Sequence, residues 1–234
     1  MRRVVRGFWG PRRESPAQLA GRWKAMLDAL PGLLPVAGPG QDWAWIRHRA
    51  SGRPAPLVPG TEELRAELQA DHDSPQTSDG AGLHLAATPA PGWEVDLTGR
   101  GGAESEYLIQ ALVLAVVSPD GAEVPEAALL ALVADVWQPD IGDVTDDDLL
   151  DALEDDAGYG VGDPCVGRLG YLSPGRAAQA PDGVGAVRKE LTGPGVLLDL
   201  APPGDTGAAV DAYLKLREAG ALEPLPRPMD RALF

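Results

Sequence analysis

The side chains most able to do chemistry in this sequence are carboxylates, and many of them lie in one short segment. Nine Asp and Glu residues fall within residues 140–156, a segment that contains no Lys or Arg. Repulsion between like charges at this density lowers the free energy of unfolding. Three arrangements would account for the segment: a metal site, a surface that binds a basic partner, or a well-hydrated acidic helix.

A metal site is the least favoured of these three arrangements. Counted from the first carboxylate, a calcium loop needs ligands at its third and fifth positions and glycine at its sixth, but Gly142, Val144 and Thr145 stand there. A catalytic metal needs carboxylates that converge in a cleft, whereas those of residues 146–156 spread around one short helix. We therefore expect neither a metal nor any other cofactor.

The other reactive side chains form no catalytic constellation. The three histidines, His48, His72 and His84, lack the spacing of metal ligands. The single cysteine, Cys165, begins an expected strand, and we expect it to be buried and unreactive. The signatures of serine hydrolases, zinc peptidases, P-loop proteins and dinucleotide-binding proteins are all missing. The sequence therefore predicts a protein that is not an enzyme.

Charge is distributed very unevenly along the chain. Residues 1–70 hold eleven Lys and Arg against six Asp and Glu, and residues 164–234 hold eight of each. Residues 71–163 hold twenty-one acidic residues and a single basic one, so they account for the whole negative excess. Such a surface repels nucleic acid, whose phosphates require Lys and Arg, but it attracts basic proteins. We therefore expect a basic protein partner and no direct binding of DNA or RNA.

The six tryptophans are the other distinctive group of side chains. Most are expected in the core, because such large rings contribute a great deal of buried area. Trp9, flanked by glycines and a proline, and Trp137, just before the acidic segment, could instead anchor a partner, although core packing is favoured for Trp9. With the first carboxylates they form the expected contact group, which is Trp9, Trp137, Asp140, Asp143, Asp146, Asp147, Asp148 and Asp151.

The elements that must position these residues follow from apolar periodicity and turn residues. Strands are predicted over residues 2–10, 43–49, 82–89, 93–99, 107–117, 165–173 and 195–201. Helices are predicted over residues 14–33, 61–71, 123–137, 145–156 and 205–220. The strands cluster instead of alternating with helices, so the sequence predicts an α+β fold with an antiparallel sheet flanked by helices. We expect one domain over residues 1–234, in which residues 50–80 hold a loop and a short helix.

Two of the helices have recognisable starts. Ser15 can cap the first long helix, with Pro16 in its first turn, where the missing N–H costs nothing. Thr145 is expected to cap the acidic helix, because Asp148 follows three residues later at the spacing of a capping box.

No targeting or membrane-spanning segment is expected. Residues 1–15 are basic, but glycine, proline and further arginines interrupt them before an apolar run of a secretory signal could form. The longest uncharged apolar run, Tyr107 to Val117, is far shorter than the roughly 20 residues of a membrane helix. We therefore expect a soluble, cytoplasmic protein.

Three stretches of the sequence carry a resemblance to a known family. Residues 3–30 read RVVRGFWGPRRESPAQLAGRWKAMLDAL, residues 130–150 read LALVADVWQPDIGDVTDDDLL, and residues 166–173 read VGRLGYLS, with GPGVLLDLA following at 193–201. In this order they resemble immunity protein family 52, in which a strand ending in an aromatic-Trp-Gly-Pro-Arg turn leads into an amphipathic helix. Arg168 departs from the family pattern, which favours Trp at that position.

The resemblance implies a cytoplasmic immunity protein that binds and neutralises a cognate toxin of a bacterial polymorphic toxin system. For this family the toxins look mostly like restriction-endonuclease-fold nucleases, and no catalytic residue is implied. An acidic inhibitor suits such a partner, because a nuclease presents basic residues to its phosphodiester substrate. The alternatives are an acidic adaptor or scaffold for another basic protein and a metal-dependent hydrolase built on the acidic segment. The oligomeric state stays open.

Overall fold

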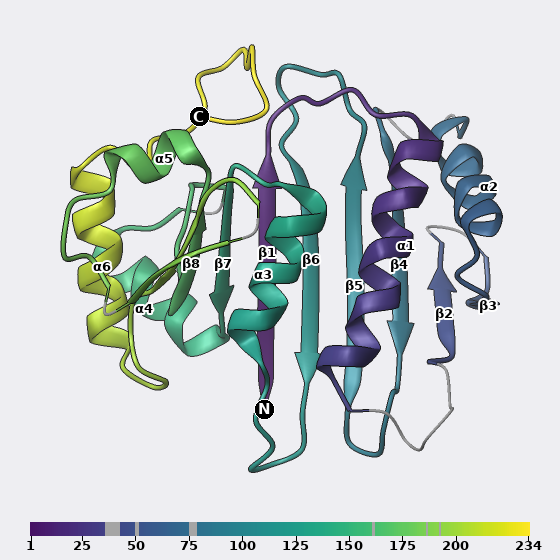
Figure 1. Ribbon diagram of the computed structural model, residues 1–234, viewed down its shortest axis with the longest axis horizontal. Helices are drawn as coiled ribbons and strands as arrows, with labels where there is room; N and C mark the ends of the chain where they lie inside the picture. The colour runs from purple at the N-terminus through teal and green to yellow at the C-terminus, as the bar shows by residue number, and fades with distance from the viewer. Residues whose placement is uncertain (36–42, 50–51, 75–78, 161, 186, 192) are drawn as a thin grey trace.

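One antiparallel sheet organises the described part of the chain, which comprises residues 1–234 except 36–42, 50–51, 75–78, 161, 186 and 192. In the described part, the computed structural model has ten strands in the order β3-β2-β4-β5-β6-β1-β7-β8-β10-β9 (Figure 1). The strands are β1 (Arg2–Trp9), β2 (Trp45–His48), β3 (Ala55–Leu57), β4 (Ala81–Ala87), β5 (Glu94–Gly101), β6 (Gln110–Val117), β7 (Ile141–Thr145), β8 (Leu169–Leu172), β9 (Val187–Glu190) and β10 (Val196–Asp199). The helices are α1 (Pro16–Leu33), α2 (Thr61–His72), α3 (Glu126–Trp137), α4 (Asp147–Ala157), α5 (Pro174–Gln179) and α6 (Thr206–Glu218). The predicted α+β fold, an antiparallel sheet flanked by helices, is confirmed.

Strand β1 lies inside the sheet and joins segments that are far apart in the sequence. It pairs along its whole length with β6, and its residues Val4 to Phe8 pair with β7. In the second pairing Arg6 stands directly opposite Asp143. The basic N-terminal strand is therefore the immediate neighbour of the acidic segment.

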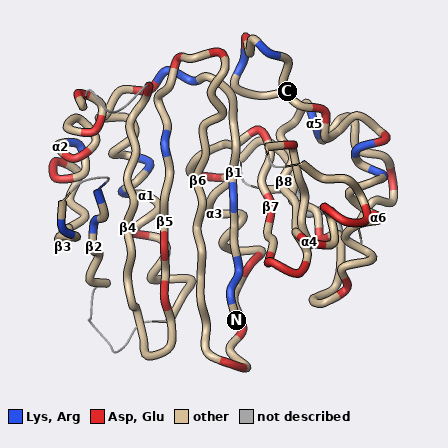
Figure 2. Tube along the Cα trace, turned by 180° about the vertical axis from the view of Figure 1, so that it is seen from behind, with Lys and Arg blue, Asp and Glu red and all other residues tan. Residues whose placement is uncertain are grey.

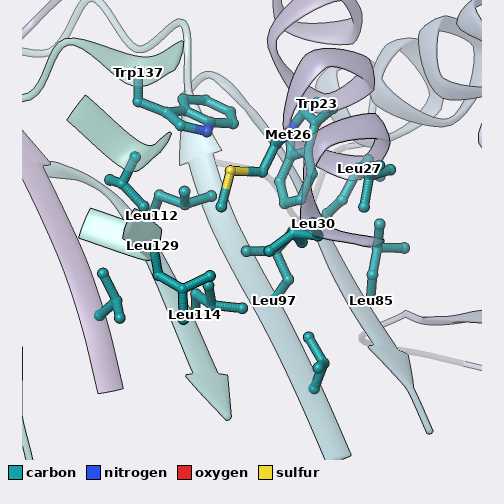
Figure 3. Packing of buried hydrophobic residues seen from close by; sticks show 14 of the residues in the cluster. Trp23, Met26, Leu27, Leu30, Leu85, Leu97, Leu112, Leu114, Leu129 and Trp137 are labelled. Atoms are coloured by element: carbon teal, nitrogen blue, oxygen red, sulfur yellow. The ribbon is translucent and has the colours of Figure 1, made fainter. Parts of the chain in front are cut away.

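Helices α1 and α3 lie over one face of the sheet and form the main core with it (Figure 1). Side chains alternate between the two faces of a strand, and on β6 Leu112 and Leu114 are fully buried on the face that these helices cover. Figure 3 shows Trp23, Met26 and Leu30 of α1 packing among such sheet residues. Each large apolar side chain buried in this way contributes about 1.5–3 kcal/mol of transfer free energy.

Helix α3 approaches the sheet closely over two glycines that face each other across β1 and β7. A Cβ atom added at Gly7 would lie 2.9 Å from Val133 Cγ1, and one added at Gly142 would lie 3.2 Å from Leu130 Cδ1. Both contacted side chains belong to α3. The alternation along β1 therefore places Arg6 on the opposite face of the sheet.

A second core lies on that opposite face, but only over the C-terminal strands. Ile141, Leu172 and Leu198 of β7, β8 and β10 pack there with Leu149 and Leu153 of α4 and with apolar residues of α6. Figure 2, which views the sheet from behind, shows β4, β5, β6 and β1 with no described helix in front of them. The sheet is thus covered on both faces at one end and on one face elsewhere.

The structure corrects two boundaries expected near the acidic segment and the apolar run. Thr145 does not cap α4, because it ends β7 and pairs with Val4 of β1. Asp146 caps the helix instead, accepting a hydrogen bond from the Leu149 backbone N–H at 3.0 Å. The strand predicted over residues 107–117 begins only at Gln110.

Other expected features are found where the sequence placed them. Ser15 and Gln18 form a capping box at the start of α1. Within residues 50–80 the short helix is α2, preceded by the three-residue strand β3, while residues 50–51 and 75–78 lie outside the described part. None of the described helices is both long enough and apolar enough to cross a membrane.

Candidate partner-binding surface

Asp140 is a buried structural anion and not a surface carboxylate. It is 2% exposed. Arg176 donates to its carboxylate from Nε at 2.8 Å and Nη2 at 2.7 Å, Ser173 Oγ donates at 2.9 Å, and the Phe234 backbone N–H donates at 2.7 Å. Asp140 therefore ties the start of β7 to α5 and to the C-terminal residues. Asp140 is therefore not the exposed surface carboxylate that was expected, because buried partners hold its two oxygens.

Asp143 is buried too, and the same correction applies to it. It is 0% exposed, and Arg6 Nε donates to its two oxygens at 2.9 and 3.2 Å. Burial raises the pKa of Asp143, and the charge of Arg6 opposes that rise.

Cys165 is buried as predicted, and burial raises the pKa of its thiol, which disfavours the reactive thiolate.

Asp146 and Asp147 pair with arginines at the start of β1. Arg3 donates to Asp146, and Arg2 Nη1 donates to Asp147 at 3.1 Å. Figure 2 shows the blue segments of β1 beside the red of β7 and α4. Asp146 is half-buried by its contacts, whereas Asp147 stays exposed. Four of the nine carboxylates in residues 140–156 are thus compensated within the protein.

Trp9 and Trp137 lie in the core, so their expected role as exposed anchors is corrected as well. Both are 0% exposed. Their rings stack with centroids 5.6 Å apart, and Trp23 of α1 packs edge-on against Trp137 at 5.5 Å. The guanidinium of Arg12 covers Trp9 at 4.9 Å. This cluster joins β1, α1 and α3, and it serves packing.

Arg168, at the position where the family pattern favours Trp, has a structural partner. It pairs with Glu126 at the start of α3, a carboxylate that also accepts from Arg3 Nε at 2.8 Å. Glu126 is only 7% exposed. Two arginines therefore neutralise one nearly buried carboxylate and join α3 to β1 and to the segment before β8.

One face of α4 is what remains exposed of the acidic segment. Its apolar side, formed by Leu149, Leu153 and Ala157, is buried in the second core. The other side carries the remaining five carboxylates, all of them exposed, which are Asp148, Asp151, Glu154, Asp155 and Asp156. Ion pairs between described residues reach Asp146 and Asp147 but none of these five. The exposed face of α4 is therefore a fixed, uncompensated negative surface.

An exposed apolar group beside the open face of the sheet escaped the sequence analysis. Tyr107, Leu108 and Ile109 are 58%, 40% and 40% exposed. They were hidden because the sequence continues them into β6 as one apolar run, whereas pairing begins at Gln110. The length of that run, eleven residues, could have indicated that part of it lies outside the strand, since strands usually have about 5–6 residues.

A cleft of about 590 Å³ opens beside this group, over β1 and the start of β6. Arg6 and Arg176 line it, but each is already paired with a buried carboxylate. Asp163 and Arg227 add one charge of each sign to the lining. The apolar side chains in its lining include Phe8, Ile109, Ile141, Tyr159 and Leu225.

The histidines do not assemble a metal centre. His48 and His84 stack with ring centroids 4.8 Å apart on the open face, and Asp96 Oδ2 lies 2.7 Å from His84 Nε2. His72 lies apart from them, at the end of α2 beside Asp73. Across the described ranges, no three His, Cys, Asp or Glu side chains are grouped so that they could hold a metal ion.

Comparisons with known proteins give a likeness in fold alone. No protein-family model matches the chain, and no curated protein sequence matches it. Among solved structures, the chain is similar to the Pseudomonas aeruginosa T6SS protein PA0821, with a TM-score of 0.52 and 13% sequence identity. The likeness covers 94% of this chain and 73% of that chain. Membership of immunity protein family 52 therefore stays a prediction.

Proposed function

We propose that this protein is an immunity protein that binds and neutralises a cognate toxin used in bacterial competition. The observation that carries the proposal is the exposed face of α4, with five carboxylates that have no described ion pair, on a helix fixed to the core by buried leucines. Two likenesses support it. Three sequence stretches resemble immunity protein family 52, and a solved structure of similar fold is named as a T6SS protein.

The proposed partner is a basic nuclease domain, the class of toxin that the family resemblance implies. A nuclease needs Lys and Arg to hold the phosphates of its substrate. The α4 carboxylates present fixed negative charges to such a surface. These charges attract the basic toxin, which accelerates association, and they repel nucleic acid. The buried pairs of Asp140 and Asp143 take no part in this attraction, because their charges are already compensated.

Co-expression with the toxin domain encoded by the neighbouring gene tests the proposal. Growth should be rescued, and the two proteins should co-purify as a stable complex. Persistent toxicity with no complex would contradict the proposal, and the adaptor for another basic protein would then become the better explanation.

Charge reversal on α4 tests the role of this surface. Asp151→Lys/Asp155→Lys should slow association at low salt by at least about tenfold and flatten its salt dependence, measured by stopped-flow mixing. Glu62→Lys/Glu63→Lys changes the net charge equally on exposed positions of α2, at the other end of the sheet (Figure 1). This control should associate nearly as fast as wild type. Equal slowing by both variants would mean that net charge alone, and not α4, directs association.

A further inference from the structure

Three adjacent apolar side chains are exposed just before β6, yet their loop is fixed. Exposure of Tyr107–Ile109 to water is unfavourable, and contiguous apolar exposure of this kind marks interaction sites. Hydrogen bonds hold the loop: Tyr107 N donates to Ser105 Oγ at 3.3 Å, and Met229 N donates to Glu106 O at 2.7 Å. A group that is already ordered loses little entropy when a partner binds.

The cleft beside this loop suits an uncharged side chain. Phe8, Ile109 and Tyr159 contribute apolar surface to its lining. Arg6 and Arg176 also line it, but their charges are balanced by the buried carboxylates that they contact. An apolar group that packs against these two arginines therefore leaves neither of their charges buried without a partner.

The segment that follows α4 forms part of the lining of the cleft. That helix ends at Ala157, and Tyr159, Asp163 and Pro164 of the segment that follows line the cleft. A protein that lies on the α4 carboxylates thus needs to extend only past the helix end to reach the cleft. An apolar centre beside a charged margin is the usual composition of a protein interface.

We infer that the basic partner of α4 inserts an apolar side chain, of the size of Leu or Phe, into this cleft and packs on Tyr107–Ile109. The inference rests on the proposed function and assigns a second part of its binding surface. In this arrangement the α4 carboxylates govern mainly the association rate. The cleft and its rim govern mainly the dissociation rate, because apolar contacts form only after the two proteins have met.

Removal of the exposed apolar rim tests the inference. Leu108→Ser/Ile109→Ser should speed dissociation from the purified toxin domain by at least about tenfold, measured by surface plasmon resonance. The association rate should change by less than about threefold. Val58→Ser is the matched control, because Val58 is 75% exposed just beyond β3 at the far edge of the sheet. This control should change neither rate.

A second variant fills the cleft and keeps its rim. Ala111→Phe adds bulk at a half-buried position in the lining, and it should also speed dissociation while its melting temperature stays near that of wild type. Wild-type dissociation rates in both variants would overturn the inference and leave the complex and the proposed function intact. Absence of any wild-type complex would refute the proposed function itself. If wild type is a dimer and the Leu108→Ser/Ile109→Ser variant is a monomer, the inference would also be overturned, because a second copy would then occupy the surface.

Discussion

Arg6 and Asp143 are 137 positions apart in the chain, but they stand opposite each other on β1 and β7. A buried ion pair gains Coulomb energy and loses the hydration of both ions, so its net contribution to stability is small. Loss of one partner is far more costly, because it leaves the other charge buried alone. We therefore expect this pair, and that of Asp140 with Arg176, to specify which segments meet more than to add stability.

The first prediction separates the cost of an unpaired buried charge from the net contribution of the ion pair to stability. Arg6→Met should lower the free energy of unfolding by about 3–5 kcal/mol, because Asp143 then stays buried without its partner. Arg6→Met/Asp143→Leu should recover most of that loss, since both charges are gone. Urea unfolding at pH 7 measures both. A double variant as unstable as the single one would show that the ion pair does contribute a large net stability.

The second prediction concerns alkaline pH and Tyr171. Its hydroxyl donates to Pro194 O at 2.7 Å, and burial raises the pKa of Tyr171 from 10.0 to about 12. Because the folded pKa lies above the unfolded one, this contribution is fully present below pH 10 and is lost as the pH rises toward 12. The loss amounts to about 2–3 kcal/mol at most.

The Tyr171→Phe variant isolates this titration. It should be less stable than wild type by about 1 kcal/mol at pH 8, because the hydrogen bond to Pro194 is missing. Urea unfolding at several pH values should show the difference closing and then reversing between pH 10 and 12, since only wild type has this tyrosine to ionise and its loss exceeds the contribution of the hydrogen bond. A difference that stays constant over that range would contradict the assignment.

For single residues, the sequence predicts whether a side chain is buried better than it predicts which side chain it contacts. Burial of Cys165 and core packing for most tryptophans follow from residue type alone, and the structure confirms both. Asp140 and Asp143 were expected at the surface because carboxylates seldom lie buried. Nothing near them in the chain indicates arginines 36 and 137 positions away.

The residue that caps helix α4 has two roles, and the third prediction distinguishes them. Asp146 caps the helix and also accepts from Arg3 of β1. Asp146→Ala should lower the free energy of unfolding by about 1–2 kcal/mol, since both interactions are lost. Asp146→Ser keeps the cap and should recover most of this loss in urea unfolding. Equal instability of the two variants would assign the effect to the pair with Arg3.

Among the elements, those defined by local pattern were predictable and those defined by tertiary pairing were not. Strands β4, β5 and β6 were predicted from their local patterns, and they lie next to one another in the sheet. Strand β7 was missed, because all five of its residues are buried and Asp143 interrupts its apolar character. The start of β6 was misplaced because pairing with β1 determines it. Gln110, the first residue of β6, lies opposite Trp9, where β1 ends before Gly10 and Pro11.

Across the whole molecule, the fold partly resolves the uneven charge of the sequence. The sheet places the basic strand β1 beside the acidic segment, and arginines of β1 neutralise three of its carboxylates. Arg176 neutralises a fourth. What is left of the negative excess in that segment is concentrated on the exposed face of α4. This concentration is unfavourable for the free protein, so its retention agrees with the proposed binding role.

The cost to the free protein follows from spacing along α4. Asp151 lies three or four positions from Asp147, Asp148, Glu154 and Asp155, and all of these side chains are exposed. Like charges at such spacings each destabilise a helix by roughly 0.2–0.5 kcal/mol. Salt screens this repulsion, because the charges are in contact with solvent. Stability and partner binding should therefore respond in opposite directions to the same substitutions.

The last prediction follows from that opposition. Asp151→Lys/Asp155→Lys should raise the free energy of unfolding by about 1 kcal/mol at low salt, and the gain should shrink as salt increases. The same variant should bind the toxin more slowly. Glu62→Lys/Glu63→Lys should bring no such gain, because acidic residues in the first turn of α2 are favoured by the helix dipole. An α4 variant that is more stable and yet associates as fast as wild type would separate the acidic surface from partner recognition. The carboxylates of α4 would then serve only the hydration of the free protein.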